Sequence, residues 1–297
     1  MTAVKVVILL LQASIFLLVL RLGLSATFED AASLLRRPGL MLRSLIAMNI
    51  IMPVFAVLLA LAFRLQPAVE AALIVLAVSP VPPVLPQKQL KLGGSSSYVM
   101  GLLVTTALLA VIVTPLTIAA AGMVFHLQLG IAPAQVAKVV ITTVLLPLAL
   151  GMLVHARAPG LAQRIGPAMG RVATAILVVA AICLLVVEWR PMKGLIGQGT
   201  LWSMTVFVLT GVAVGYWLGG PNPTDRTALG LATASRHPGL AISIAAANFP
   251  RQIGLITAAI LLYLLVKAVV LLPYNAWSKR RIAKVERPSA ADEEKAA

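Results

Sequence analysis

The chain has 297 residues, of which 60% are hydrophobic and 11% are charged, and its mean hydropathy is +1.00. A soluble domain of this length needs more polar surface, so the composition indicates a protein that lies in a lipid bilayer. The net charge of +15 does not indicate a nucleic-acid partner, because the basic residues flank apolar segments, as they do in membrane proteins. The single cysteine, Cys183, excludes an internal disulfide and a cysteine-rich metal site.

Apolar segments of spanning length follow one another along the chain. The first, Val4 to Leu24, has no small-residue cleavage site, so we interpret it as a retained helix rather than a signal peptide. A single transmembrane domain is expected at 1–275, followed by a charged, disordered cytoplasmic tail at 276–297. The nine predicted spans are 4–25, 40–63, 67–93, 96–122, 136–156, 169–189, 199–218, 224–249 and 252–274.

Two of these spans are interrupted by proline, polar groups and a positive charge. The third span is broken near 80–86 and the eighth near 235–239. Unpaired backbone groups and charges are costly in hydrocarbon, so such breaks are rarely accidental. Broken helices at matching places in two halves of a chain are typical of secondary transporters, whose site forms where the breaks meet. The residues that break the helices are Pro80, Pro82, Pro83, Pro86, Pro238 and Gly239.

The order of the spans indicates an inverted repeat. Spans one to four recur as spans six to nine, which gives repeats at approximately 4–122 and 169–274 in opposite orientations. In the seventh span, Gly211, Gly215 and Gly219 recur every four residues and predict close packing with a neighbouring helix.

Loop charge predicts the orientation of the chain. Lysine and arginine favour the cytoplasmic side, so the C-terminus is expected in the cytoplasm and the N-terminus outside, in a bacterial cytoplasmic membrane. The opposite loops carry only Arg64, Arg190, Lys193 and Arg251. The residues that define the cytoplasmic side are Arg21, Arg36, Arg37, Arg43, Arg157, Arg164, Arg171, Lys279, Arg280, Arg281 and Lys284.

The order of several short motifs resembles the bile acid:sodium symporter family, over approximately residues 4–273. These motifs are Arg37-Pro38 through Met52-Pro53, the Pro80 break, Thr114-Pro115, Leu146 to Gly151, and Gly239-Leu240-Ala241. The family commonly has ten spans, and this chain resembles relatives that lack the first.

This resemblance implies an all-α inverted-repeat transporter with two crossed discontinuous helices, in which organic anions enter between a panel and a core. The panel would comprise 4–25, 136–156 and 169–189, and the core 40–122 and 199–274.

The chain departs from the family pattern where sodium would bind. Leu85-Pro86 stands in place of a Ser-Asn pair, and Val99 and Leu103 replace hydroxyl ligands. Ala232 and Arg236-His237 replace a Glu and a Gln-Asn pair, and Met48, beside Asn49, replaces a Gln. Sodium is a hard cation that needs several oxygen ligands. Only Glu70 and Glu188 are expected near membrane spans, both at span ends, so we expect transport to be independent of sodium.

Positive side chains are the candidates to replace the sodium ions. Arg236 is expected at the C-terminal end of a half-helix, where its guanidinium can satisfy free carbonyls, and Lys88 near a half-helix N-terminus. The substrate is therefore predicted to be a small or medium organic anion. Further hydrogen-bonding candidates are Asn49, Gln87, Gln89, Thr105, Thr106, Ser235 and His237.

Plainer interpretations of these residues stay open. Lys88 can equally belong to a cytoplasmic loop, and Arg236 can tie carbonyls without touching substrate. His237 either carries a coupling proton, which makes protons a candidate partner, or bonds only to backbone. Lys267 is expected to extend toward the cytoplasmic end of its span.

Three further functional classes compete with an anion carrier. An intramembrane enzyme needs a catalytic set such as paired carboxylates or a Ser/His pair, and the predicted spans contain none, so no catalytic residue, metal or cofactor is predicted. A channel-like derivative or a transport-dead sensor stays possible because fold does not determine function. A sodium-coupled symporter that uses only backbone carbonyls is the last alternative.

Overall fold

The computed structural model describes residues 3–63 and 65–285, and all regular elements in this part of the chain are helices. A helix satisfies its own backbone hydrogen bonds, which hydrocarbon requires. Seven helices among the described residues are long and apolar enough to cross a membrane. They are α1 (Ala3–Gly23), Pro38–Ala62, α7 (Ser96–Val124), Pro133–Arg157, α10 (Pro159–Gly194), α11 (Thr200–Leu218) and α14 (Ile253–Val285).

Two of the seven contain a widened, π-helical turn just before a proline. In the first, α3 (Pro38–Ile46) and α4 (Met52–Ala62) flank the π turn Ala47–Ile51. In the second, α8 (Pro133–Val140) and α9 (Leu146–Arg157) flank the π turn Ile141–Leu145. Proline lacks an N–H, and a π turn is one way in which a helix adjusts to that loss.

The two interrupted spans each consist of two short helices. α5 (Pro67–Ala77) and α6 (Leu85–Lys91) are separated by residues 78–84, and α12 (Pro223–Thr233) and α13 (Pro238–Asn248) by residues 234–237. With the seven long helices they reproduce the predicted order of elements. That each pair crosses the membrane, for nine crossings in all, stays a prediction. A short connection, α2 (Phe28–Ala32) and the 3-10 turn Ser33–Arg36, joins α1 to α3.

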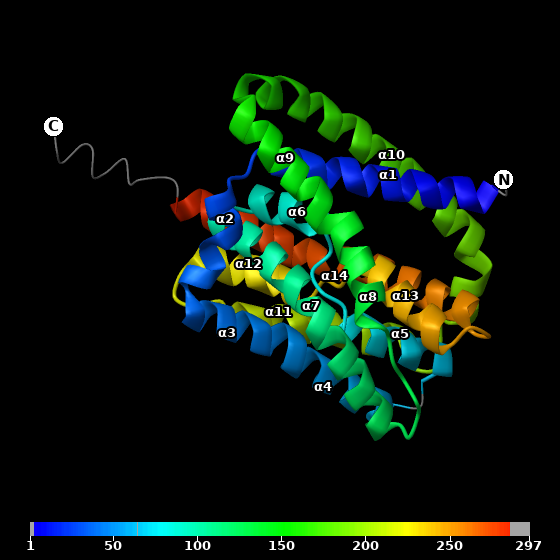
Figure 1. Cartoon of the computed structure of the whole chain (residues 1–297). Coiled ribbons are helices and arrows are strands. Elements are labelled where there is room, and N and C mark those ends of the chain that lie inside the picture. Colours follow the sequence, from blue (N-terminus) through cyan, green and yellow to red (C-terminus); the bar gives the residue numbers. More distant parts are fainter. Residues whose placement is uncertain (1–2, 64, 286–297) are drawn as a thin grey trace.

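The helices form two groups. α1 packs against both α9 and α10, and Figure 1 shows these three together at one edge of the bundle. The remaining helices form the larger group, in which α11 packs on α12 and α14 packs on α5 and α13. The predicted panel segment 136–156 also includes part of α8, so the division into a panel and a core stays a prediction.

Glycines allow the closest helix contacts in both groups. A Cβ on Gly23 would lie 2.3 Å from the Leu148 carbonyl oxygen, and a Cβ on Gly151 would lie 2.3 Å from that of Leu20. The predicted close packing of the α11 glycines is also present. A Cβ on Gly215 would lie 2.5 Å from the carbonyl oxygen of Leu229 in α12. The backbone of α12 is therefore held directly against α11.

The C-terminal segment corrects one expectation. α14 continues to Val285, so the beginning of the predicted disordered tail, residues 276–285, is helical. The ring of Trp277 packs on Tyr216 and Tyr274, and the Arg281 guanidinium lies 5.4 Å from the centroid of the Trp277 ring. These aromatic contacts with α11 explain why the helix persists beyond the apolar sequence. Residues 286–297 lie outside the described part of the chain.

Candidate functional site

The two interruptions meet, as the sequence predicted. The backbone N–H of His237 donates to the carbonyl oxygen of Pro80 at 3.0 Å, and Nη1 of Arg236 donates to the carbonyl oxygen of Ser79 at 3.2 Å. Each bond joins the segment between α12 and α13 to the segment between α5 and α6. The ends of four short helices are thus brought to one place in the fold.

At the first interruption, other helices satisfy the carbonyls that α5 leaves free. The prolines that follow α5 have no N–H, so they cannot continue its hydrogen-bond ladder. The Thr114 hydroxyl of α7 donates to the carbonyl of Val78 at 3.0 Å, and the Arg236 guanidinium donates to the carbonyl of Ser79. The Ser79 hydroxyl donates back to Val75 at 2.7 Å. Three segments therefore stabilise the end of α5.

At the second interruption, a tyrosine and a histidine perform the equivalent roles. The Tyr263 hydroxyl of α14 donates to the carbonyl of Ala234 at 2.8 Å. Nδ1 of His237 accepts the N–H of Leu240 at 3.2 Å and so caps the start of α13. Because Nδ1 accepts, the ring proton is assigned to Nε2, which lies 3.2 Å from the Thr143 hydroxyl oxygen. A neutral imidazole therefore satisfies both contacts.

Arg236 is completely buried and connects three segments. Besides the Ser79 carbonyl, its guanidinium donates from Nη2 to the Met48 carbonyl at 3.1 Å. In the π turn, the Met52 N–H bonds to Ala47, and Pro53 has no N–H to offer Met48. Arg236 thus supplies the donor that the proline removes. Arg236 was expected to donate to the free carbonyls at the end of its own half-helix, α12. That expectation is wrong in detail, because the Tyr263 hydroxyl donates to the Ala234 carbonyl there.

The polar residues of α6 face different neighbours. Gln87 donates to the Leu18 carbonyl of α1 at 2.8 Å, and Arg21 of α1 lies 3.5 Å from the Gln87 side-chain oxygen. Gln89 is buried and donates to the Ala228 carbonyl of α12 at 2.6 Å. Lys88, between them, is half-buried on this short helix rather than in an irregular segment; whether it belongs to the site or to the cytoplasmic surface stays a prediction.

The remaining predicted site residues are Thr105, Thr106, Ser235 and Asn49. The Thr106 hydroxyl donates to Leu102 in its own helix at 2.7 Å, and no described hydrogen bond connects Thr105 or Thr106 to the interruptions. Ser235 is buried within the second interruption, and Asn49 is half-buried in the π turn beside Met48. Their contact with a substrate stays a prediction.

Sequence reasoning did not assign roles to Thr114, Thr143 or Tyr263. Each is a hydroxyl side chain within a long apolar helix, and each donates to or meets a residue of an interruption or its cap. Hydroxyls in such positions could have been flagged, since buried hydroxyls almost always have a hydrogen-bond partner. Which carbonyl each would serve depends on how the helices pack.

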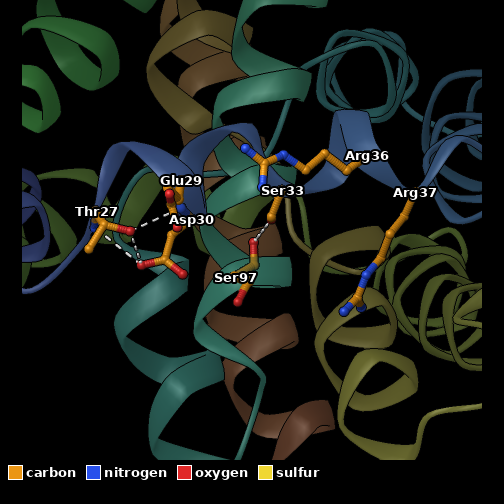
Figure 2. Close-up of a pocket in the computed structure, with 7 residues that line it drawn as sticks. All are labelled: Thr27, Glu29, Asp30, Ser33, Arg36, Arg37 and Ser97. Carbon is orange, nitrogen blue, oxygen red and sulfur yellow. Dashed lines mark hydrogen bonds between the residues drawn. The ribbon is translucent and has the colours of Figure 1, made fainter.

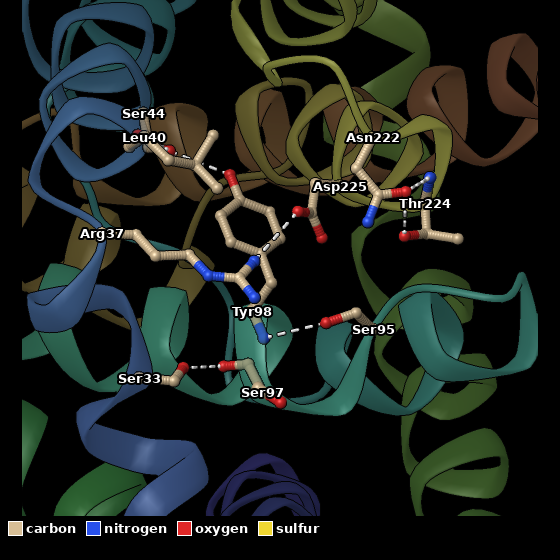
Figure 3. A network of polar contacts seen from close by, with 10 residues as sticks. All are labelled: Ser33, Arg37, Leu40, Ser44, Ser95, Ser97, Tyr98, Asn222, Thr224 and Asp225. Carbon is tan, nitrogen blue, oxygen red and sulfur yellow. Dashed lines mark hydrogen bonds and ion pairs between the residues drawn. The ribbon is translucent and has the colours of Figure 1, made fainter.

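A second polar network lies where α2 and the 3-10 turn cross the beginning of α7 (Figure 3). Arg37 pairs with Asp225 at 3.5 Å, and the hydroxyls of Ser44 and Tyr98 lie 2.8 Å apart. Ser33 donates to the backbone carbonyl of Ser97. Asp225 is 2% exposed, so the sequence-based statement that only Glu70 and Glu188 are acids near spans is wrong. Asp225 stands in the first turn of α12, where an acidic residue is favourable.

A polar pocket of about 270 Å³ opens beside this network (Figure 2). Both acidic and basic side chains line it. The Asp30 carboxylate already bonds to Thr27 in the capping box at the start of α2. It is separate from the meeting point of the interruptions, since none of its lining residues belongs to them. The lining residues are Thr27, Glu29, Asp30, Ser33, Arg36, Arg37 and Ser97.

These features define an integral membrane protein of many helices in which two interrupted helices meet around a buried arginine. The model of the sodium bile acid symporter family matches residues 13–192, more than half of the chain, and the chain belongs to that family. The match includes the first interruption and ends before the second. No curated protein sequence matches the chain. Family membership makes it a polytopic membrane protein of a transporter family rather than of an enzyme family.

Proposed function

We propose that this protein is a secondary active carrier for a small or medium organic anion, that it works by alternating access, and that it does not require sodium. Membership of a transporter family supports the general class. The observation that carries the specific proposal is the Arg236 guanidinium, held at the meeting point by the carbonyls of Ser79 and Met48.

A fixed arginine at this point performs the structural task of a bound cation. Its planar group has five donors and remains charged, so it can bind carbonyls at helix ends permanently. A sodium ion would need several oxygens, and the carbonyls of Ser79 and Met48 already accept from Arg236. It would also be repelled by the guanidinium, strongly so in a medium of low dielectric. This favours the sodium-independent carrier over a symporter that uses backbone carbonyls.

The positive charge of Arg236 favours an anionic substrate. Arg236 has no described acidic partner, because the ion pair in the described part of the chain joins Arg37 to Asp225. An uncompensated positive charge lowers the cost of bringing an anion between the helices. Of the two interpretations of His237, the hydrogen bond from the Leu240 N–H to its Nδ1 favours the one without a coupling proton. Its Nδ1 must stay unprotonated in order to cap α13.

Counterflow in proteoliposomes tests the proposal. Purified protein is loaded with pyruvate, succinate or cholate, and entry of the same labelled anion is followed in potassium or choline buffer and then in sodium buffer. We expect saturable counterflow at equal rates in all three buffers for at least one anion. A steep requirement for sodium would contradict the role of Arg236. Flux without saturation or counterflow would identify a channel-like derivative instead.

A further inference from the structure

A second pocket, of about 320 Å³, shares Arg37 with the pocket of Figure 2 but includes neither of its acidic residues. Residues at the beginning of α3 line one part of it, and the turn between α11 and α12 lines another. Asp225, in the first turn of α12, also lines it. No residue of the two interruptions does, so this pocket is separate from their meeting point.

The pocket lies where spanning helices begin and end. α3 begins beside it, and α11 ends directly before the turn that holds Gly220, one of the lining residues. The side chain of Trp217, in the last turn of α11, is 84% exposed. An exposed tryptophan at the end of a spanning helix is typical of the level of the lipid headgroups. Arg37 and Arg43 belong to the side that the loop charge predicts to be cytoplasmic, so the pocket is expected at the surface of the inner leaflet.

The groups at the start of α3 favour an anion. Arg43 is exposed and lines the pocket, and none of the described hydrogen bonds or ion pairs involves it. α3 begins without a side-chain cap, which leaves the first N–H groups of the helix, at Gly39 and Leu40, without a capping acceptor. No atom lies within 4 Å of a Cβ placed on Gly39, so this part of the backbone is open. Phosphate oxygens bind well to such N–H groups and to arginine.

The Asp225 carboxylate adds a requirement for a hydrogen-bond donor. Asp225 is almost completely buried, and its Oδ2 pairs with Arg37, toward which it points in Figure 3. Its Oδ1 has no hydrogen-bond partner among the described groups. A buried carboxylate oxygen without a donor is costly, and a hydroxyl group of a ligand would remove that cost.

The balance of charge decides which headgroup fits. Arg37 and Asp225 compensate each other, so the charge of Arg43 is left over in the lining of the pocket. A phosphodiester carries one negative charge and compensates it. An ammonium group on the same ligand would restore a positive charge beside two arginines, which is unfavourable. The pocket therefore favours a headgroup with one negative charge and a hydroxyl over a zwitterionic one.

We propose that this pocket binds the headgroup of an anionic phospholipid that carries free hydroxyls, as phosphatidylglycerol does. The phosphate accepts hydrogen bonds from Arg43 and from the N–H groups at the start of α3, and a headgroup hydroxyl donates to Oδ1 of Asp225. The acyl chains lie against apolar surface such as the exposed side chain of Leu42. Basic pockets between helices at the cytoplasmic surface are suited to such headgroups. The inference goes beyond the proposed function, because it does not depend on which anion the carrier transports.

Thermal unfolding of the delipidated full-length protein in a neutral detergent, with lipid added in increasing amounts, tests the site. Phosphatidylglycerol is compared with phosphatidylmethanol, which has the same charge but no headgroup hydroxyl, and with zwitterionic phosphatidylethanolamine. A ligand that binds only the folded state raises the melting temperature. We expect the largest rise with phosphatidylglycerol. Glycerophosphoglycerol, the same headgroup without acyl chains, should cause little or no rise.

Arg43→Gln tests the charge of the site. The apparent affinity for phosphatidylglycerol should fall about fivefold, because one basic residue near a membrane surface is worth about 1 kcal/mol. Arg36→Gln is the matched control. Arg36 is exposed in the neighbouring 3-10 turn and lines the other pocket, so its loss should leave the affinity unchanged. Without lipid, both variants should melt as the wild type does, which shows that they fold.

Gly39→Leu tests the space. Its side chain would fill the pocket without a clash at Cβ, so the response to phosphatidylglycerol should disappear. Gly160→Leu is the matched control, since Gly160 also follows a proline at the start of a helix, α10, and is equally open. Neither variant should melt lower than the wild type without lipid, because leucine is a better helix former than glycine.

Other outcomes would overturn the proposal in distinguishable ways. Equal responses to phosphatidylglycerol and phosphatidylethanolamine would reject the charge argument, and an equal response to phosphatidylmethanol would reject the role of Asp225. A full response to glycerophosphoglycerol would assign the pocket to a soluble phosphodiester. Equal losses in Arg36→Gln and Arg43→Gln would indicate general attraction to a basic surface. The anion carrier is tested separately by counterflow, so its failure would not be confused with any of these results.

Discussion

Arg236 is the residue on which the meeting of the two interruptions most depends. Arg236→Ala would leave the Ser79 and Met48 carbonyls without donors, at a cost of about 1–3 kcal/mol each. We expect a lower melting temperature and a loss of counterflow. Arg236→Lys keeps the charge but loses the planar fork, so it should retain only part of both. Arg251→Ala, at an exposed position, is the control.

A double variant tests by a second measurement whether Arg236 takes the place of a sodium ion. Ala232→Glu combined with Arg236→Gln places side-chain oxygens at the two positions where the family resemblance implies sodium ligands. Sodium should raise the melting temperature of this double variant more than that of the wild type. If Arg236→Ala matches the wild type in stability and flux, the arginine has no part in the site.

At the scale of elements, the packing of α11 on α12 positions the second interruption. Gly215→Ala would bring a Cβ to 2.5 Å from the Leu229 carbonyl oxygen and 2.6 Å from the Thr233 hydroxyl oxygen. Because that contact is made with backbone, α12 must move, at a cost of about 1–3 kcal/mol. We expect lower thermal stability and reduced flux. Gly254→Ala in α14, where no atom lies within 4 Å of the new Cβ, should be neutral, and equal effects would refute the packing argument.

For the whole molecule, the number of membrane crossings follows from whether the interrupted helices span. Lys193, in the last turn of α10, and Lys279, near the end of α14, are both exposed. If α12 and α13 together cross once, these residues lie on opposite sides of the membrane. If that pair does not cross, only α11 and α14 separate them, and they lie on the same side.

Cysteine labelling distinguishes these topologies. In a Cys183→Ser background, a membrane-impermeant maleimide should label Lys193→Cys but not Lys279→Cys in intact cells. Inside-out vesicles should show the reverse, in agreement with the arginine-rich side being cytoplasmic. Labelling of both positions from one side would refute nine crossings.

The sequence alone determined the membrane setting, the order of the helices and the positions of both interruptions. These features are local, because apolar length limits what can span and a proline removes an N–H wherever it stands. It also identified Arg236 and Lys88 as charges that need an explanation. It did not show that residues 276–285 are helical, since aromatic contacts with α11 support that segment.

Only the tertiary structure decided which groups meet. Arg236 bonds to Met48, 188 residues away in the chain, because a π turn before Pro53 frees that carbonyl at the place where the interruptions touch. The burial of Asp225 likewise depends on neighbouring helices. Hydrogen bonds and charge interactions between distant residues act over only a few ångströms, so they are determined by helix packing rather than by local sequence.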